Sequence, residues 1–132
     1  MNLTSIKLIF SIFGPDLDVE QFSLLVGLKP SASWMVGDIV RNSPSQHRKE
    51  TCWEYSIGFI DTLYVSDLTK NFIEIFGEKE AIISNYSNSK SLKCKVDFIV
   101  KVSKGQFPSI YFDLAFLSAL NRINSEIDID IY

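Results

Sequence analysis

The sequence is poor in the residues that most often build catalytic and metal centres. Its 132 residues include one histidine and two cysteines, and the cysteines do not form a C-x-x-C pair. A catalytic triad, a Cys-His pair or a histidine metal site would have to be assembled around His47. Glycine-rich phosphate loops, the G-x-S-x-G and H-E-x-x-H motifs and zinc-ligand spacings are also missing. We therefore expect a protein that is not an enzyme and that uses no cofactor and no metal.

The chain also lacks a strong excess of charge and any long apolar run. Its formal net charge of −3 is too small to steer it toward nucleic acid or an anionic membrane. No uncharged apolar stretch approaches the roughly 18 residues that span a bilayer. No basic start is followed by an apolar stretch and a small-residue cleavage site. We expect a cytoplasmic protein with no nucleic-acid and no membrane partner.

The chain does contain enough apolar material for one hydrophobic core. Apolar residues make up 46% of it and aromatic residues 13%, so residues 1–132 should fold as a single domain. Cys52 and Cys94 both lie in strand-like segments. We expect them to be free, buried thiols that fill space, because free cysteine behaves as a small apolar residue and disulfides are rare in reducing compartments.

Four segments alternate apolar and polar residues with the two-residue period of a strand, namely 3–13, 52–59, 92–103 and 127–132. The residues that we expect on the buried face of the second segment are Trp53, Tyr55, Ile57 and Phe59. In the last segment the isoleucines should point to the core, whereas Asp128 and Asp130 should point away from it.

Three segments show the spacing and the end signals of helices. The first begins at Asp18 as N-cap and ends at Gly27, and the third begins at Asp113 as N-cap. The second runs from Val65 to about Gly77, with Ser66 or Asp67 as its cap, and residues 78–83 can add further turns. Two polar segments are expected as loops: 84–91, and the long segment 29–50 with room for one edge strand.

This order of elements predicts an α+β fold. Helices too few to cover both faces favour an antiparallel or mixed β-sheet with about three helices packed on one face. Residues 3–26 and 93–123 also share the order strand, glycine, proline, helix. Two intertwined ferredoxin-like halves would produce this internal similarity.

Five short motifs occur along the chain in a characteristic order: Gly14-Pro15-Asp16-Leu17-Asp18, Gly27-Leu28-Lys29-Pro30, Gly37-Asp38, Trp53-Glu54-Tyr55-Ser56 and Ile127-Asp128-Ile129-Asp130-Ile131-Tyr132. In this the chain resembles the bacterial family known as domain of unknown function 4279. The resemblance implies a compact α+β fold in the bacterial cytoplasm, without an established activity or catalytic residues. Some small, diverse bacterial domains of this kind are similar to immunity proteins that neutralise a toxin, by analogy of fold and lifestyle.

The candidate partner-binding residues of the long loop are Trp34, Arg41, His47, Arg48 and Lys49. The segments Ser33–Met35 and His47–Lys49 depart from the family pattern, which favours a partner-specific role there. For Trp34 we favour folding back over a core edge, and the alternative is an exposed interface anchor. His47 is interpreted as a surface residue. Three cations near one tryptophan are too few to indicate nucleic-acid binding.

The terminal strand supplies the remaining candidates, Asp128, Asp130 and Tyr132. The two aspartates and the C-terminal carboxylate share one strand face, so they could bind a basic partner or a cation, or they could form a solvated edge that opposes aggregation. Lysines of segment 92–103 on the same face would instead neutralise them.

The leading hypothesis is therefore a non-enzymatic binding domain with a protein partner, in its most specific form an immunity protein that occludes a toxin. One alternative is a small-ligand or enzymatic domain with a carboxylate-lined cleft near Asp38, Trp53 and Asp130. It predicts a concave pocket whose carboxylates have perturbed pKa values, whereas the leading hypothesis predicts a flat or convex patch with apolar anchors. A third possibility is a structural domain that associates with a copy of itself through an edge strand.

Overall fold

The computed structural model describes residues 3–132. The strands are β1 (Ser5–Gly14), β2 (Ala32–Trp34), β3 (Ile39–Val40), β4 (Ser43–His47), β5 (Thr51–Asp61), β6 (Lys93–Lys101) and β7 (Ser125–Ile131). The helices are α1 (Val19–Val26), α2 (Val65–Phe76), the short 3₁₀ helix η1 (Gly77–Lys79), α3 (Glu80–Ser89) and α4 (Leu114–Arg122).

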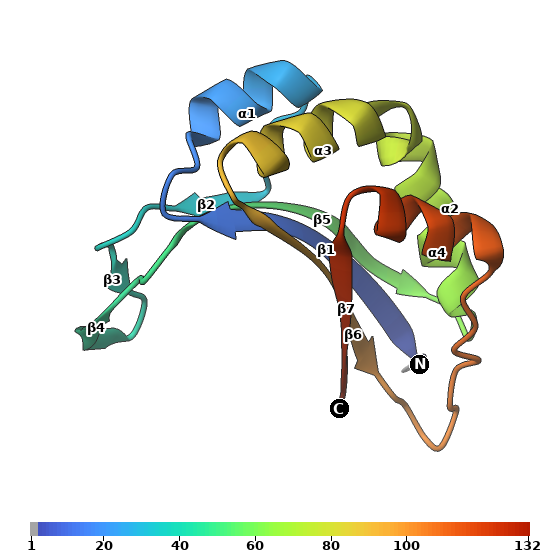
Figure 1. Ribbon diagram of the computed structural model, residues 1–132. Coiled ribbons are helices and arrows are strands. Elements are labelled where there is room, and N and C mark those ends of the chain that lie inside the picture. The colour runs from blue at the N-terminus through green and yellow to red at the C-terminus, as the bar shows by residue number, and fades with distance from the viewer. Residues whose placement is uncertain (1–2) are drawn as a thin grey trace.

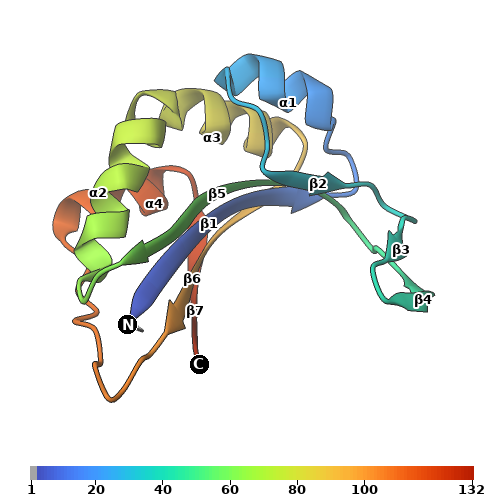
Figure 2. The same ribbon diagram turned by 180° about the vertical axis from the view of Figure 1, so that it is seen from behind.

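The main sheet has five strands in the order β2-β5-β1-β6-β7. Its neighbours run antiparallel except β6 and β7, which are parallel, so the sheet is mixed. The helices all lie on one side of this sheet (Figure 1), as the view from behind also shows (Figure 2). The predicted α+β fold with a mixed sheet and helices on one face is confirmed.

The two predicted ferredoxin-like halves are not equivalent. Strands β5 and β6 are parallel to one another with β1 between them, because each pairs antiparallel with β1, and this is the split β-α-β arrangement of a ferredoxin-like half. The other end of the chain differs, because β6 and β7 are parallel and directly adjacent. The similarity between residues 3–26 and 93–123 is therefore one of element order and not of topology.

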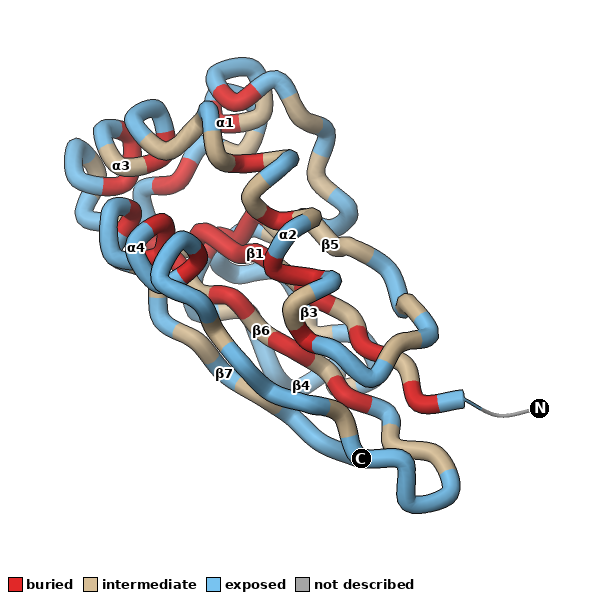
Figure 3. The backbone as a smooth tube through the Cα atoms, turned by 90° about the vertical axis from the view of Figure 1, so that its right-hand side faces the viewer, coloured by how far each residue is buried: buried red, intermediate tan, exposed pale blue. Residues whose placement is uncertain are grey.

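The hydrophobic core lies between the sheet and the helices. Residues of β6 between its two exposed ends alternate between buried and partly exposed, and those of β1 do so except at Ser11, which is also buried (Figure 3). At the centre of the core, the ring of Phe10 lies 4.9 to 6.4 Å from those of Trp53, Phe72 and Phe76. Edge-on and tilted contacts of this kind add to the free energy of burying the rings. The buried indole Nε1 of Trp53 donates to Ser23 Oγ at 3.0 Å, which joins β5 to α1.

The prediction that Phe59 shares the core face of β5 is wrong. The register between β1 and β5 shifts between Ile6, which pairs with Ile60, and Leu8, which pairs with Ile57. One extra residue in β5 is accommodated there, and such a bulge reverses the side on which the following residues point. Ile60 therefore packs against the core, and Phe59 lies on the opposite face, under the ammonium group of Lys101 at 4.4 Å.

The helix caps were predicted correctly for two of the three expected helices. Asp18 Oδ1 accepts from the backbone N–H of Gln21, and Asp113 Oδ1 accepts from that of Phe116. At α2 the predicted caps Ser66 and Asp67 are wrong, because the N-cap is Tyr64 and has no side-chain cap bond. The carboxylate of Asp67 instead accepts from Thr62 Oγ1 at 2.6 Å.

Two segments that were expected as loops contain regular structure. Most of 84–91 belongs to α3, where Ile83 and Tyr86 are buried and the Tyr86 hydroxyl accepts from the backbone N–H of Asp18 at 3.1 Å. Tertiary burial of one helix face outweighs the polar composition of this segment. Segment 29–50 contains β2 at the edge of the main sheet and the separate β3–β4 hairpin.

None of the helices in residues 3–132 is long and apolar enough to cross a bilayer.

The position of Phe10 predicts a large effect of truncation. Phe10→Ala should lower the free energy of unfolding by about 3 to 5 kcal/mol, because it removes a fully buried ring from the centre of the aromatic cluster. Phe107→Ala removes the same group from a side chain that is 73% exposed, and should change stability by less than about 0.5 kcal/mol. Urea denaturation of both variants measures the difference, and similar losses would show that the core is not centred on Phe10.

Candidate functional site

The face of the sheet opposite the helices is open and concave. The sheet curves so that the β3–β4 hairpin extends from one end and β7 forms the other side (Figure 1). Residues that alternate with the core residues point to this face. On β1 these include Ser11 and Phe13, which the register places beside Glu54 and Cys52 of β5 and beside Lys95 and Lys93 of β6.

A hollow of about 330 Å³ lies on this open face between the hairpin and the centre of the sheet. We call it the concave hollow. Its lining combines two aromatic rings, one thiol and charges of both signs: Ser11, Phe13, Trp34, Arg48, Lys49, Glu50, Cys52, Glu54, Lys95 and Asp97. Such a mixture of apolar surface with a few convergent polar groups is typical of a binding site.

Trp34 and Arg48 form one wall of the concave hollow. Trp34 pairs with Cys52 at the edge of the sheet, and its indole is half-buried. The guanidinium carbon of Arg48 lies 4.0 Å from the ring centre, a distance at which a cation is attracted to the ring face. The prediction that Trp34 covers a core edge is wrong, because the ring is held on the open face and does not belong to the hydrophobic core.

Two carboxylates lie on the floor of the concave hollow, one on each side of β1. Burial raises the pKa of Glu54, and the negative charge of Asp97 raises it further, although a hydrogen bond from Ser11 acts in the opposite direction. Burial also raises the pKa of Asp97. Lys95, whose Nζ lies 3.6 Å from Asp97 Oδ1, lowers it, and Asp128 and Asp130 raise it. Positive charge within the protein therefore does not fully balance these carboxylates.

The two cysteines lie on opposite faces of the sheet. Cys52 pairs with Phe13 and faces the concave hollow, whereas Cys94 pairs with Ile12 and belongs to the core. Both are buried and free, as the sequence predicted. Burial raises the pKa of each thiol to about 12, so neither is a reactive thiolate near neutral pH. In residues 3–132 no three side chains of His, Cys, Asp or Glu form a group that could hold a metal ion.

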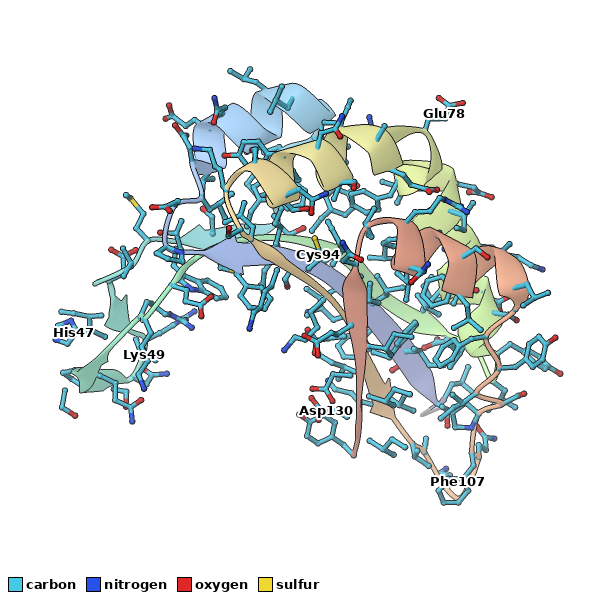
Figure 4. All side chains as sticks on the ribbon, in the orientation of Figure 1. His47, Lys49, Glu78, Cys94, Phe107 and Asp130 are labelled. Carbon is cyan, nitrogen blue, oxygen red and sulfur yellow. The ribbon has the colours of Figure 1, made fainter. Side chains whose placement is uncertain are left out.

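The structure brings only some of the candidate loop residues together. Trp34, Arg48 and Lys49 all line the concave hollow. Arg41 is exposed after β3, and the exposed His47 has its Nδ1 3.0 Å from the carbonyl oxygen of Gly37. His47 and Lys49 lie on the hairpin side of the molecule, across the open face from Asp130 (Figure 4). Arg41 and His47 are therefore placed on the hairpin, outside the hollow.

The candidate residues of the terminal strand lie at the opposite side of the open face. Asp128 pairs with Asp97 and Asp130 with Ile99, so both carboxylates point to the open face and are exposed. Tyr132 is 73% exposed, and its backbone bonds to Val100 and Val102. Ile127 and Ile129 pack against the core as predicted, but Ile131 is 55% exposed.

The residues predicted to form a carboxylate-lined cleft do not meet. Trp53 is fully buried on the helix side of the sheet, and Asp38 accepts from the backbone N–H of Met35 in the loop before β3. A concave site with perturbed carboxylates does exist, but Glu54 and Asp97 form it. Sequence reasoning missed both residues. The available signal was their place at polar positions of alternating strands. Only the strand register shows that they lie on either side of β1, with Glu54 beside Ser11 and Asp97 beside Ile9.

The fold and the hollow define a small α+β protein with one covered and one open sheet face. The model of the family described as Domain of unknown function (DUF4279) matches residues 4–132, so the chain belongs to this family. No curated protein and no solved structure matches the chain.

Because the pKa of Glu54 is raised, a substitution that removes its negative charge should increase the free energy of unfolding, by an amount that depends on pH. A carboxyl with a raised folded-state pKa binds its proton more tightly when folded, so its ionised form costs stability above that pKa. Glu54→Gln should therefore stabilise the fold at pH 7 by a few tenths to about 1 kcal/mol, since solvent still screens this half-buried group. The gain should disappear below the ordinary value of 4.5.

Urea denaturation across this pH range checks the prediction, with Glu78→Gln as a control at an exposed glutamate on the far side of the molecule (Figure 4). A loss of stability in Glu54→Gln at pH 7, or a gain that is the same at every pH, would contradict the raised pKa.

Proposed function

We propose that this protein is a non-enzymatic binding domain that receives a protein partner on its concave sheet face. The concave hollow carries the proposal, because it combines the half-buried ring of Trp34, the side chain of Phe13 and charges of both signs in one site. Tryptophan and arginine are the residues most often found at the energetic centres of protein interfaces. The stacked Trp34–Arg48 pair supports such a centre.

In its specific form, we propose an immunity protein in the bacterial cytoplasm that neutralises a toxin by occlusion. The β3–β4 hairpin supports this form, because it extends the open face beyond the sheet and bears the polar residues Arg41 and His47. A rim of this kind can contact a partner that is too large for the hollow alone. The free thiols of Cys52 and Cys94 are compatible with a reducing compartment.

The test is a pull-down from lysate of the native organism, washed at low and then at high salt, with three baits. The unmodified protein should retain one stoichiometric partner at high salt. Trp34→Ala should lose it by about tenfold or more, because it removes the central anchor. Phe107→Ala removes an exposed ring at the far loop and should retain the partner (Figure 4). A partner held equally well by all three baits, or no partner in repeated trials, overturns the proposal.

The immunity form has a separate test. The product of the neighbouring gene is expressed with and without this protein, and growth is measured. Rescue by the unmodified protein and by Phe107→Ala, but not by Trp34→Ala, is the expected result. A neighbouring product that does not inhibit growth would remove the toxin from the proposal and leave the binding domain.

A second candidate function is the binding of a small cationic ligand in the same hollow. The specific observation is the pair Glu54 and Asp97, whose negative charge the protein does not fully balance. A guanidinium or ammonium group placed between them would reduce their repulsion and form charge-assisted hydrogen bonds.

Thermal denaturation with added arginine or spermidine tests this second candidate. A one-site ligand raises the midpoint with concentration, and Glu54→Gln should abolish the increase whereas Glu78→Gln should not. Equal shifts in both variants would indicate non-specific ion binding and remove the candidate.

A further inference from the structure

We propose that the outer edge of β7 pairs with an extended segment of a protein partner that carries lysine or arginine at every second residue. This inference rests on the proposed function, because it names the kind of segment that the partner would contribute. The site is the free edge of the main sheet at the side opposite the β3–β4 hairpin (Figures 1 and 4).

The backbone of β7 has one side engaged and one side available. Tyr132 donates its N–H to the carbonyl of Val100 and accepts from the N–H of Val102, which is the parallel pattern in which one residue bonds to two of its neighbour strand. With a period of two, Asp130 and Asp128 face β6 in the same way. The N–H and C=O groups of Ile127, Ile129 and Ile131 therefore point outward, where no other strand of residues 3–132 pairs with them.

The side chains beside this edge carry charge of one sign. Glu126, Asp128 and Asp130 are exposed and point to the concave face. Neither Asp128 nor Asp130 forms an ion pair within residues 3–132, and the ammonium group of Lys95, which the register places beside Glu126, is paired with Asp97. A strand added at the edge would place every second side chain beside one of these carboxylates, at a distance where opposite charges attract. Basic residues at those positions complement the edge.

The same charges oppose pairing with a second copy of this chain. Two β7 strands joined antiparallel about a twofold axis would bring the acidic residues of both copies onto the same face of one continuous sheet. Like charges directly opposite one another destabilise such a pair, which is a common protection of edge strands. The edge therefore selects a basic strand and discourages an identical one.

The intervening residues of the partner segment would lie on the helix side of the sheet, beside the isoleucines. Ile131 is 55% exposed there, so apolar side chains at these positions would cover it. The inferred sequence of the segment thus alternates basic and apolar residues over about six positions, which matches the seven residues of β7.

The direct test uses a synthetic peptide, acetyl-Thr-Lys-Val-Lys-Val-Lys-Thr-amide, and NMR-detected amide hydrogen exchange of the complete protein. Binding should slow exchange of the Ile127, Ile129 and Ile131 amides and leave those of Asp128 and Asp130 unchanged, because the latter already bond to β6. A peptide of the same composition with its three lysines adjacent should bind more weakly. Uniform protection, or none at the three isoleucines, overturns the inference.

Backbone pairing has its own control in two N-methylated forms of the peptide. Methylation of the valines blocks an antiparallel strand, and methylation of the lysines blocks a parallel one, because different amides face β7 in the two cases. One of the two should lose binding. If both bind as well as the unmodified peptide, contact is through side chains only and the inference is wrong.

Paired charge variants test the basic specificity. Asp128→Asn combined with Asp130→Asn should weaken peptide binding about three- to tenfold at low salt, as expected for two exposed ion pairs. Glu74→Gln combined with Glu78→Gln makes the same change in net charge on exposed helix-side residues and should not weaken it. Equal weakening in both double variants would show attraction by net charge alone.

The outcomes separate this inference from the proposed function. If the peptide does not protect the edge but the native partner still depends on Trp34, the edge inference fails and the binding domain stands. If the peptide pairs with β7 as described but no partner depends on Trp34, the concave-face proposal fails and the edge inference stands.

Discussion

The packing of the helices against a single face of the sheet is the constraint on which the rest of the structure depends. The aromatic cluster around Phe10 fills the space between sheet and helices, and no helix of residues 3–132 crosses to the other side. A chain of this length can form one such hydrophobic core, so the residues on the second face of the sheet must contact either water or a partner. The alternation along β1 and β6 follows from this division, with core residues on one side and a mixture of charged, polar and apolar residues on the other.

The open face is not composed only for solubility. On a fully solvated face the carboxylates would stay in water, where their ionisation does not lower the stability of the fold. Glu54 and Asp97 are instead partly desolvated and close enough to repel each other, and both pKa values are raised. Groups that oppose folding in this way are frequent at functional sites, where a ligand compensates the cost. The concave hollow is therefore the part of the sheet whose ionised carboxylates lower the stability of the fold.

The sequence alone was sufficient to predict the elements that depend on local patterns of residues. The strands around β1, β6 and β7 and the caps at Asp18 and Asp113 follow from alternation and from short-range hydrogen bonds. It was not sufficient where tertiary packing outweighs composition. The polar segment that forms α3 is helical because Ile83 and Tyr86 are buried on one face.

The site was predicted less completely than the fold. Trp34, Arg48 and Lys49 were recognised from their types, but their meeting with Glu54 and Asp97 depends on strand order and register, which a single sequence does not contain. The bulge that turns Phe59 to the open face is another case. A register shift in β5 leaves no signal in the alternation of its first half, and only pairing with β1 reveals it.

The β3–β4 hairpin is built almost independently of the rest of the molecule. Its two strands pair with one another and not with the main sheet, and no residue from 29 to 50 belongs to the hydrophobic core. Substitutions and changes of length within residues 39–47 should therefore affect folding less than changes in β1 or β6. The sequence and the length of the hairpin can therefore vary while the main sheet and its helices keep the same fold.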